Sequence, residues 1–307
     1  MEGNQKVSVI IPTYNRANLL PRAIKSVLNQ TFQDFELIVV DDGSTDNTRE
    51  LVEGFQKKDS RIKYIFQENS GGPAKPINTG IKNSKGEYIA ILESDDEWLP
   101  EKLEKQIEIL DKFSNVGLVS CYTFKIFSND KKIIYKAPFS GILKKRRLEK
   151  YWQLWGILSF STVLMRRESV EKVGVLDENL KIAADVDFYF RFIKQFDFYF
   201  IPIPLINYYQ IEESQSRKEF WIRWIPEYHY LLEKHEKDFE ICKKEKSKFL
   251  RHLGTCHLLK REFLKARKYF FEAILNDPFN IRLYFQCLLS FFPKIYQKIL
   301  FIKRDNF

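Results

Sequence analysis

Short apolar runs rich in β-branched residues alternate, over the first 120 residues, with segments whose apolar residues recur at helical spacing. In residues 19–28, for example, Leu, Ala, Ile and Val return every three or four positions, as on one face of a helix. The strand-like runs occupy residues 7–11, 36–40, 62–66, 88–92 and 116–121. Strands that alternate with crossover helices predict an α/β fold with a mainly parallel sheet covered on both faces.

Polar clusters follow four of these strands at the point where each strand ends. They are Pro12-Thr13-Tyr14-Asn15, Asp41-Asp42, residues 69–72 and Glu93-Ser94-Asp95-Asp96. Each cluster alone is compatible with a turn or with a charged loop before a helix. The carboxyl ends of parallel strands, however, meet at one edge of a sheet, where open α/β sheets bind their ligands. The clusters together therefore predict one site.

The residue types at this edge suit a nucleoside diphosphate. Tyr14 offers a ring face on which a base can stack, and Asp41 or Asp42 can accept a hydrogen bond from a base N–H or a ribose hydroxyl. Glu93 and Asp95 would repel a diphosphate, because both carry negative charge. A hard divalent cation with oxygen ligands, Mn²⁺ or Mg²⁺, removes that conflict. It would also act as a Lewis acid on the departing diphosphate.

Three stretches carry a resemblance to a known family. The string VSVIIPTYNRANLLPRAIKSVLNQTFQDFELIVVDDGSTDNT resembles the opening of glycosyltransferase family 2, which contains inverting enzymes with a GT-A fold. The string KGEYIAILESDDEW resembles the metal-binding acidic motif of that family, and LDENLKIAADVDFYFRF resembles its acceptor-side segment. The resemblance covers about residues 6–216. It implies a GT-A domain over residues 1–216, with a nucleotide-sugar half at 1–120 and an acceptor half at 121–216.

The resemblance also implies roles for individual residues. Asp95 would hold the metal, and Asp185 would be the catalytic base, with Asp187 on the same segment as the alternative. Asp185 could instead cap its helix. An inverting transfer needs only one base, which takes the proton of the acceptor hydroxyl. The residues expected to bind the nucleotide-sugar are Pro12, Thr13, Tyr14, Asp41, Asp42, Lys75, Asn78, Glu93, Ser94 and Asp95.

Several positions depart from the family pattern. Glu93 stands where the acidic triplet usually begins with Asp, and Ile77 stands where the family usually has Arg, so that a phosphate contact is missing or comes from Lys75. Ala184 replaces the acid that usually precedes the base. Gln210 and Glu212 replace an Arg and a His. These departures leave open an alternative, a non-catalytic sugar-nucleotide-binding or scaffold protein.

The basic character of the chain belongs to its C-terminal part. Residues 217–307 hold 20 Lys and Arg against 11 Asp and Glu, whereas residues 1–216 hold 30 of each. The pattern there predicts a helical extension, which includes a tetratricopeptide-like hairpin over 252–276 with Ala266, Phe270 and Ala273 at packing positions. Such an excess of charge indicates either a solvated face or attraction to an anionic surface. No nucleic-acid-binding motif accompanies it, so we expect membrane-surface contact through residues 282–304 rather than nucleic acid.

Further features favour a cytoplasmic protein. The four Cys residues have no CxxC spacing, which fits a reducing compartment. No leader peptide or membrane-spanning apolar run is expected. The sequence therefore predicts transfer of one sugar from a nucleotide diphosphate sugar, with a UDP-sugar as donor, to a hydroxyl acceptor. We expect that acceptor to be a glycan or a lipid-linked glycan of cell-surface polysaccharide or glycolipid assembly, handled at the cytoplasmic face of the membrane.

Overall fold

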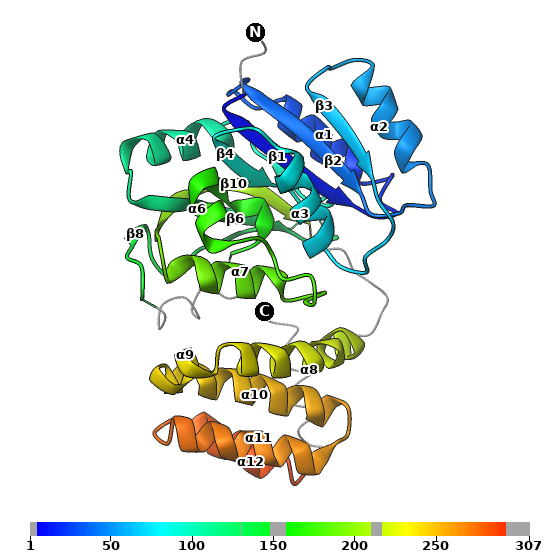
Figure 1. Cartoon of the computed structure of the whole chain (residues 1–307). Coiled ribbons are helices and arrows are strands. Elements are labelled where there is room, and N and C mark those ends of the chain that lie inside the picture. The colour runs from blue at the N-terminus through cyan, green and yellow to red at the C-terminus, as the bar shows by residue number, and fades with distance from the viewer. Residues whose placement is uncertain (1–4, 130, 148–157, 210–216, 293–307) are drawn as a thin grey trace. The chain divides into compact units, whose positions relative to one another are not determined.

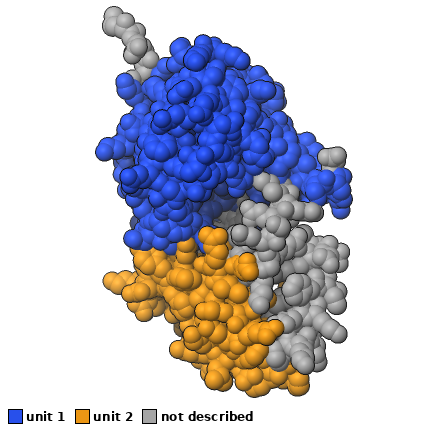
Figure 2. Space-filling model, turned by 90° about the vertical axis from the view of Figure 1, so that its right-hand side faces the viewer, with its two compact units in different colours: residues 1–212 blue, residues 213–307 orange. Residues whose placement is uncertain are grey.

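The computed structural model describes residues 5–129, 131–147, 158–209 and 217–292 (Figure 1). The contacts within the chain divide it into two compact units, residues 1–212 and residues 213–307 (Figure 2). The first unit is α/β and the second is helical, as predicted.

The first unit is built on one sheet with the strand order β3-β2-β1-β4-β9-β6-β10-β5, with β7 added beside β6 and β8 beside β10. Its N-terminal half is parallel, because β1 pairs in parallel with both β2 and β4, and β2 with β3. The strands of this half are β1 (Val7–Thr13), β2 (Phe35–Asp41), β3 (Ile62–Phe66) and β4 (Tyr88–Ile91). The parallel sheet predicted for the opening of the chain is thus confirmed.

The second half of the sheet is mixed. The strand β9 (Leu164–Arg166) runs antiparallel to β4 and to β6 (Val116–Ile126), and β6 runs parallel to β10 (Asp197–Tyr209). The register of β10 shifts near Pro204, because Pro cannot donate to the ladder. The remaining short strands are β5 (Glu97–Trp98), β7 (Lys132–Tyr135) and β8 (Gly141–Leu143).

Amphipathic helices cover the faces of the sheet (Figure 1). The first of them has Pro in its first turn and buries Leu20, Ala23, Ile24 and Val27 at helical spacing, as its sequence predicts. The α-helices of the described residues in this unit are α1 (Leu20–Leu28), α2 (Thr48–Gln56), α3 (Ala74–Asn83), α4 (Lys102–Lys112), α6 (Arg167–Val173) and α7 (Ala184–Ile193).

The close approach of α3 to β1 depends on Gly80. A Cβ atom at Gly80 would lie 2.4 Å from Cγ2 of Ile10, so only glycine fits. This contact fixes α3 against the sheet, and with it the loop of residues 69–73 that precedes the helix.

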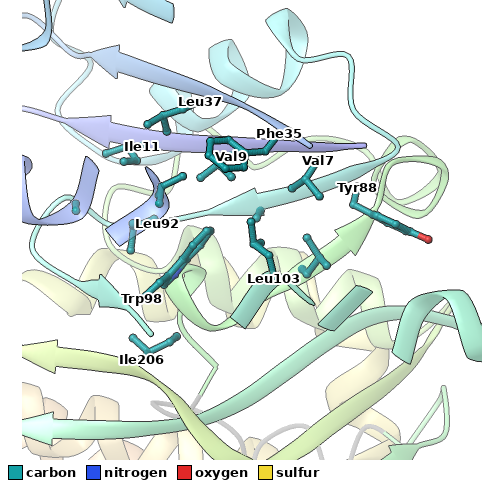
Figure 3. Close-up of a cluster of buried hydrophobic side chains, with 14 of the residues drawn as sticks. Val7, Val9, Ile11, Phe35, Leu37, Tyr88, Leu92, Trp98, Leu103 and Ile206 are labelled. Atoms are coloured by element: carbon teal, nitrogen blue, oxygen red, sulfur yellow. The ribbon is translucent and has the colours of Figure 1, made fainter. Parts of the chain in front are cut away.

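The core on one side of the sheet joins alternate residues of β1, such as Val7, Val9 and Ile11, to Leu37 of β2 and Trp98 of β5 (Figure 3). Alternation places every second side chain of a strand on the same face. The register of β1 on β4 sets Ile10 beside Ile91 and so places Pro12 close to Glu93 at the sheet edge. The core therefore decides which polar residues meet at the site.

The second unit contains α8 (Arg217–Lys234), α9 (Glu236–Ile241), α10 (Lys243–Leu259), α11 (Phe263–Asn276) and α12 (Ile281–Leu289). The pair α10–α11 is the predicted hairpin, and Ala266, Phe270 and Ala273 are buried in it. A Cβ atom at Gly254 of α10 would lie 2.9 Å from the ring of Phe270, so the two helices pack closely. No helix in the described part of the chain is long and apolar enough to cross a bilayer.

A fully buried lysine gives the first unit a pH-dependent stability. Nζ of Lys102 donates to Oε1 of Gln106 at 2.8 Å and lies 3.9 Å from the centre of the Trp98 ring. Burial lowers the pKa of Lys102 to about 7, against 10.5 for an ordinary lysine. At pH values between about 7 and 10.5, Lys102 is therefore mainly neutral in the folded state and protonated in the unfolded state.

We predict that the free energy of unfolding rises as the pH increases from about 7 to about 10, since the unfolded chain binds one more proton in that interval. The variant Lys102→Met should lose this rise and gain about 1–4 kcal/mol of stability at pH 6, because a buried charge is replaced by an apolar side chain of similar length. Urea unfolding at several pH values measures both. Lys112→Met, at an exposed position of the same helix, is the control. An unchanged pH profile in Lys102→Met would contradict the prediction.

Candidate functional site

A pocket of about 380 Å³ opens at the carboxyl ends of the parallel strands. The loops after β1, β2, β3 and β4 all contribute to its wall, together with Phe160 of the short 3-10 helix η2 (Phe160–Thr162). The four polar clusters predicted to meet at one sheet edge do meet there. The lining residues are Pro12, Thr13, Tyr14, Arg16, Asp42, Asn69, Gly71, Gly72, Pro73, Pro76, Ile77, Glu93, Ser94, Asp95 and Phe160.

The two acids after β2 have different surroundings. Asp42 lines the pocket, and its carboxylate accepts hydrogen bonds from Nε2 of Gln67 at 2.5 Å and from both the backbone N–H and the hydroxyl of Ser70 at 2.9 Å. Asp41 is not a lining residue, and it accepts from the Tyr64 hydroxyl at 2.6 Å. Burial and this bond to Asp41 raise the pKa of Tyr64 to about 12. Asp42 thus faces the pocket, whereas Asp41 supports β2 and β3 behind it.

The loop that carries Gly71 and Gly72 comes close to other backbone segments. Gly43 has φ +84°, and a Cβ atom there would lie 2.7 Å from the backbone N of Asn69. A Cβ atom at Gly72 would lie 2.9 Å from Cα of Lys181. The Lys181 ammonium donates to the Ser70 carbonyl at 3.0 Å. The loop is therefore fixed from two sides, which brings exposed backbone to the pocket wall.

The loop after β4 gathers three carboxylates. The Glu93 side chain lies at the pocket wall, and burial, followed by the charges of Asp96, Asp95 and Asp185, raises its pKa well above the usual range. Asp96 is almost completely buried. The Ser161 hydroxyl and the Tyr209 backbone favour its ionised form, but burial outweighs them and raises the pKa of Asp96 to about 7. Only Asp95 is both partly exposed and ion-paired, with Nη1 of Arg16 3.0 Å from its Oδ2.

The segment from η2 holds this loop in place. The backbone N–H of Glu93 donates to the Ser161 hydroxyl at 3.1 Å, and the Trp98 indole N–H donates to the Ser161 carbonyl at 2.9 Å. Ser161 and Phe160 belong to a stretch whose sequence shows no clear pattern, and neither was predicted to belong to the site. Arg16 was not predicted to belong to the site either, although a basic residue directly after the Pro12-Thr13-Tyr14-Asn15 cluster is a sequence signal for a phosphate contact.

The structure distinguishes the two acids at the start of α7. Asp187 is fully buried and pairs with Nε of Arg191 at 2.8 Å. The other Arg191 nitrogens donate to the carbonyls of Val173 and Val175. Through Arg191, Asp187 therefore links α7 to the end of α6 and the segment that follows it, and has a structural role. Asp185 is partly exposed, and its charge reaches Glu93 across the site. It lies inside the first turn after the N-cap Ala183 and is not the capping residue.

Besides Asp41, two further expected ligands lie away from the pocket wall. Lys75 is exposed on α3 and is not among the lining residues. Asn78 is buried, where it donates to the Leu176 carbonyl at 2.9 Å and accepts from the Leu176 N–H at 2.9 Å. It therefore ties α3 to the segment before α7. Ile77, the departure from the usual Arg, does line the pocket, and Ala184 is buried. Gln210 and Glu212 lie outside the described residues.

The donor atoms near Asp95 are carboxylate oxygens, which suit a hard cation rather than zinc. Within the described residues, no three His, Cys, Asp or Glu side chains form a closed metal cage. A cation bound at Asp95 and Glu93 would thus need further ligands from water or from a bound diphosphate, which is the usual situation of Mg²⁺ in nucleotide sites.

Comparison with known proteins assigns the sequence to a family. The model of glycosyl transferase family 2 matches residues 8–174, more than half of the chain. The chain belongs to glycosyl transferase family 2, and the resemblance seen in its motifs is confirmed.

The relatives and the solved structures agree with this assignment. An uncharacterized glycosyltransferase of Rickettsia typhi is 36% identical over 196 residues, which is 63% of this chain and 60% of the relative. Glycosyltransferase GlyG of Streptococcus pneumoniae is 40% identical over 124 residues, which is 39% of this chain and 40% of that protein. The crystal structure of S. aureus TarS 1-349 in complex with UDP-GlcNAc has a TM-score of 0.65 at 22% identity and covers 88% of this chain and 81% of that one. The GT-A fold is thereby confirmed.

We predict that the two acids of α7 differ in their effect on stability. Asp187→Ala should lower the free energy of unfolding by about 3–5 kcal/mol, because it leaves a partly buried guanidinium without its carboxylate. Asp185→Asn, at a partly exposed position, should change it by less than about 1 kcal/mol. Urea unfolding of both variants beside the wild type measures the difference. Equal losses in the two variants would contradict the roles assigned to them.

Proposed function

We propose that the pocket binds a nucleotide diphosphate sugar, with UDP as the nucleotide, and that the domain transfers one sugar to a hydroxyl acceptor with inversion. The observation that carries this proposal is the convergence of Tyr14, Asp42 and the Glu93–Asp95 loop around one pocket in a chain of this family. The likeness in fold to TarS, whose structure holds UDP-GlcNAc, supports a UDP-sugar as donor.

The two sides of the pocket suit the two parts of a nucleotide. Tyr14 leaves 47% of its surface exposed and offers a ring face for the base. Asp42, held rigid by Gln67 and Ser70, can accept from a base N–H or a ribose hydroxyl. The diphosphate would then point toward Asp95, where it meets negative charge.

A divalent cation, Mn²⁺ or Mg²⁺, would be held by Asp95 with Glu93 beside it. When bound it would supply Lewis-acid stabilisation of the leaving diphosphate. The carboxylate oxygens of Asp95 and Glu93 fit a hard cation that takes its remaining ligands from the substrate and water.

Asp185 is the proposed catalytic base. It would take the proton of the acceptor hydroxyl while that oxygen bonds to the anomeric carbon and the bond from this carbon to the nucleoside diphosphate breaks. The partial exposure of Asp185 and its electrostatic reach to Glu93 support this role. Asp187, buried against Arg191, is unsuited to this role.

We predict that Asp95→Ala and Asp185→Asn each lower the rate of UDP release from a UDP-sugar in the presence of Mn²⁺, by at least about 100-fold, the contribution usual for a general base. The assay is donor hydrolysis or transfer by the full chain. Lys75→Gln, at an exposed position outside the pocket, is the control and should keep its rate. Equal turnover by all the variants and the wild type would refute the catalytic assignment. Donor binding without any turnover would favour the non-catalytic binding protein.

The helical unit suggests where the acceptor is found. Ile281, Tyr284, Phe285 and Leu288 are exposed on α12 at positions i, i+3, i+4 and i+7, and so share one face. An aromatic and aliphatic face on a basic unit fits an anionic membrane surface. We therefore propose a peripheral location at the cytoplasmic face and a lipid-linked glycan as acceptor. This would place the enzyme in cell-surface polysaccharide or glycolipid assembly. Residues 293–304, also expected to take part, lie outside the described residues.

We predict that the full chain floats with vesicles containing phosphatidylglycerol and floats poorly with neutral vesicles. A truncation ending near Asn280 should lose this binding, and so should the full-length double variant Phe285→Glu/Leu288→Glu, which adds charge to the apolar face. Ile241→Glu, at an even more exposed apolar position on α9, is the control. Equal partitioning of all these proteins would refute membrane contact, and a change in size-exclusion volume of the double variant alone would point to self-association instead.

A further inference from the structure

Arg16 has a distinctive position in the pocket. Among the described residues that line it, Arg16 is the only lysine or arginine. Three of its neighbours in the wall, Asp42, Glu93 and Asp95, are acidic. A diphosphate entering this pocket would therefore meet one positive side chain.

The backbone of Arg16 is held by the loop after β2. Asn15, with φ 51°, accepts from the Thr45 N–H at 2.8 Å, and its own N–H donates to the Ser44 hydroxyl at 2.9 Å. The Ala17 N–H donates to Asp46 at 3.1 Å. With both neighbours anchored, the guanidinium can move only through its own side-chain torsions.

The guanidinium is paired with Asp95, the proposed cation ligand. Nη1 of Arg16 lies 3.0 Å from Oδ2 of Asp95, and both side chains are about one-third exposed. Arg22 holds the same residue from the other side, since its Nη2 donates to the Asp95 carbonyl at 2.5 Å. Arg22 is itself stacked 3.5 Å from the centre of the Tyr209 ring. Arg22 thus fixes the backbone of Asp95, whereas the partly exposed Arg16 that pairs with its carboxylate can be replaced by another cation.

We propose that Arg16 neutralises Asp95 before donor and cation bind. When they bind, the Arg16 side chain moves so that its guanidinium leaves Asp95 and pairs with the diphosphate. This inference rests on the proposed function. The Asp95 carboxylate can either keep its ion pair with Arg16 or coordinate a cation, because the two compete for the same oxygen atoms. A guanidinium released beside a diphosphate has a planar donor set that matches phosphate oxygens. The exchange gives both Asp95 and Arg16 an oppositely charged partner in either state.

The surroundings support this role for Arg16. Ile77 occupies the wall where the family pattern has Arg, and Lys75 lies exposed outside the wall. Lys181 directs its ammonium at the carbonyls of Ser70 and Glu178. Arg16 would therefore provide the cationic phosphate contact from the opposite side of the pocket, the β1 side.

The test measures binding, not turnover, on the full chain. Isothermal titration gives the Kd of Mn²⁺ alone, of UDP with Mn²⁺ and of uridine for the wild type, Arg16→Gln and Arg16→Lys. For Arg16→Gln we expect Mn²⁺ alone to bind about 2- to 5-fold more tightly, because Asp95 loses a competing partner. UDP should bind about 10-fold more weakly or worse, because the diphosphate loses a charged hydrogen-bond donor. Uridine, which has no phosphate, should bind equally.

Arg16→Lys keeps the charge without the planar fork, so its UDP affinity should lie between those of the wild type and Arg16→Gln. Lys25→Gln, which removes one charge from an exposed position of α1, is the control and should match the wild type. Equal UDP affinity in Arg16→Gln and the wild type would overturn the role of Arg16 while leaving the donor site intact. A wild type that binds no UDP with Mn²⁺ would instead overturn the proposed function.

Discussion

Electrostatic repulsion among carboxylates is the constraint around which this molecule is built. Glu93, Asp95, Asp96 and Asp185 act on one another at a single sheet edge. At an effective dielectric constant of about 20, two such charges 4 Å apart repel by about 4 kcal/mol. Burial, followed by repulsion, raises the pKa of Glu93, and burial raises that of Asp96, so the fold makes the ionised forms of both side chains less favourable than they are in water. Other interactions in the fold must offset this unfavourable electrostatic free energy.

The compensation comes from the core beneath the site and from the groups around it. The register of β1 on β4 and the apolar residues of the core fix the strand ends, and a slip by one residue would exchange the two faces of the strand. Ser161 and Trp98 tie the acidic loop to η2. Arg16 and Arg22 bring positive charge to Asp95. Rigidity of the scaffold is therefore what allows the acidic groups to remain close together.

The sequence predicts the parts of this arrangement that depend on local pattern. Strand runs, helical spacing and polar strand ends are local features, and parallel pairing brings the polar ends together whatever the details of packing. Both Asp41 and Asp42 were expected to contact the nucleotide. That only Asp42 lines the pocket could not be predicted, because consecutive residues at a strand end point to opposite sides and the environment of each depends on β3. The use of Asn78 was equally hidden, since its partner Leu176 is 98 residues away in the chain. Arg16 and Phe160 reach the pocket through loop conformations that no periodicity encodes.

The charge balance of the pocket has a thermodynamic consequence for the proposed reaction. Among the described residues that line it, three acids face one arginine, and a diphosphate would add further negative charge to the same space. Donor alone would meet repulsion from Asp95, and cation alone would have to displace Arg16. When both enter together, the cation neutralises Asp95 and the released guanidinium meets the phosphate, so each ligand removes the obstacle to the other. Such coupling is reciprocal by linkage: whatever factor the cation adds to donor affinity, the donor must add to cation affinity. A pocket built in this way would hold its cation only while a nucleotide is present, which agrees with a site that offers two carboxylates instead of a closed cage.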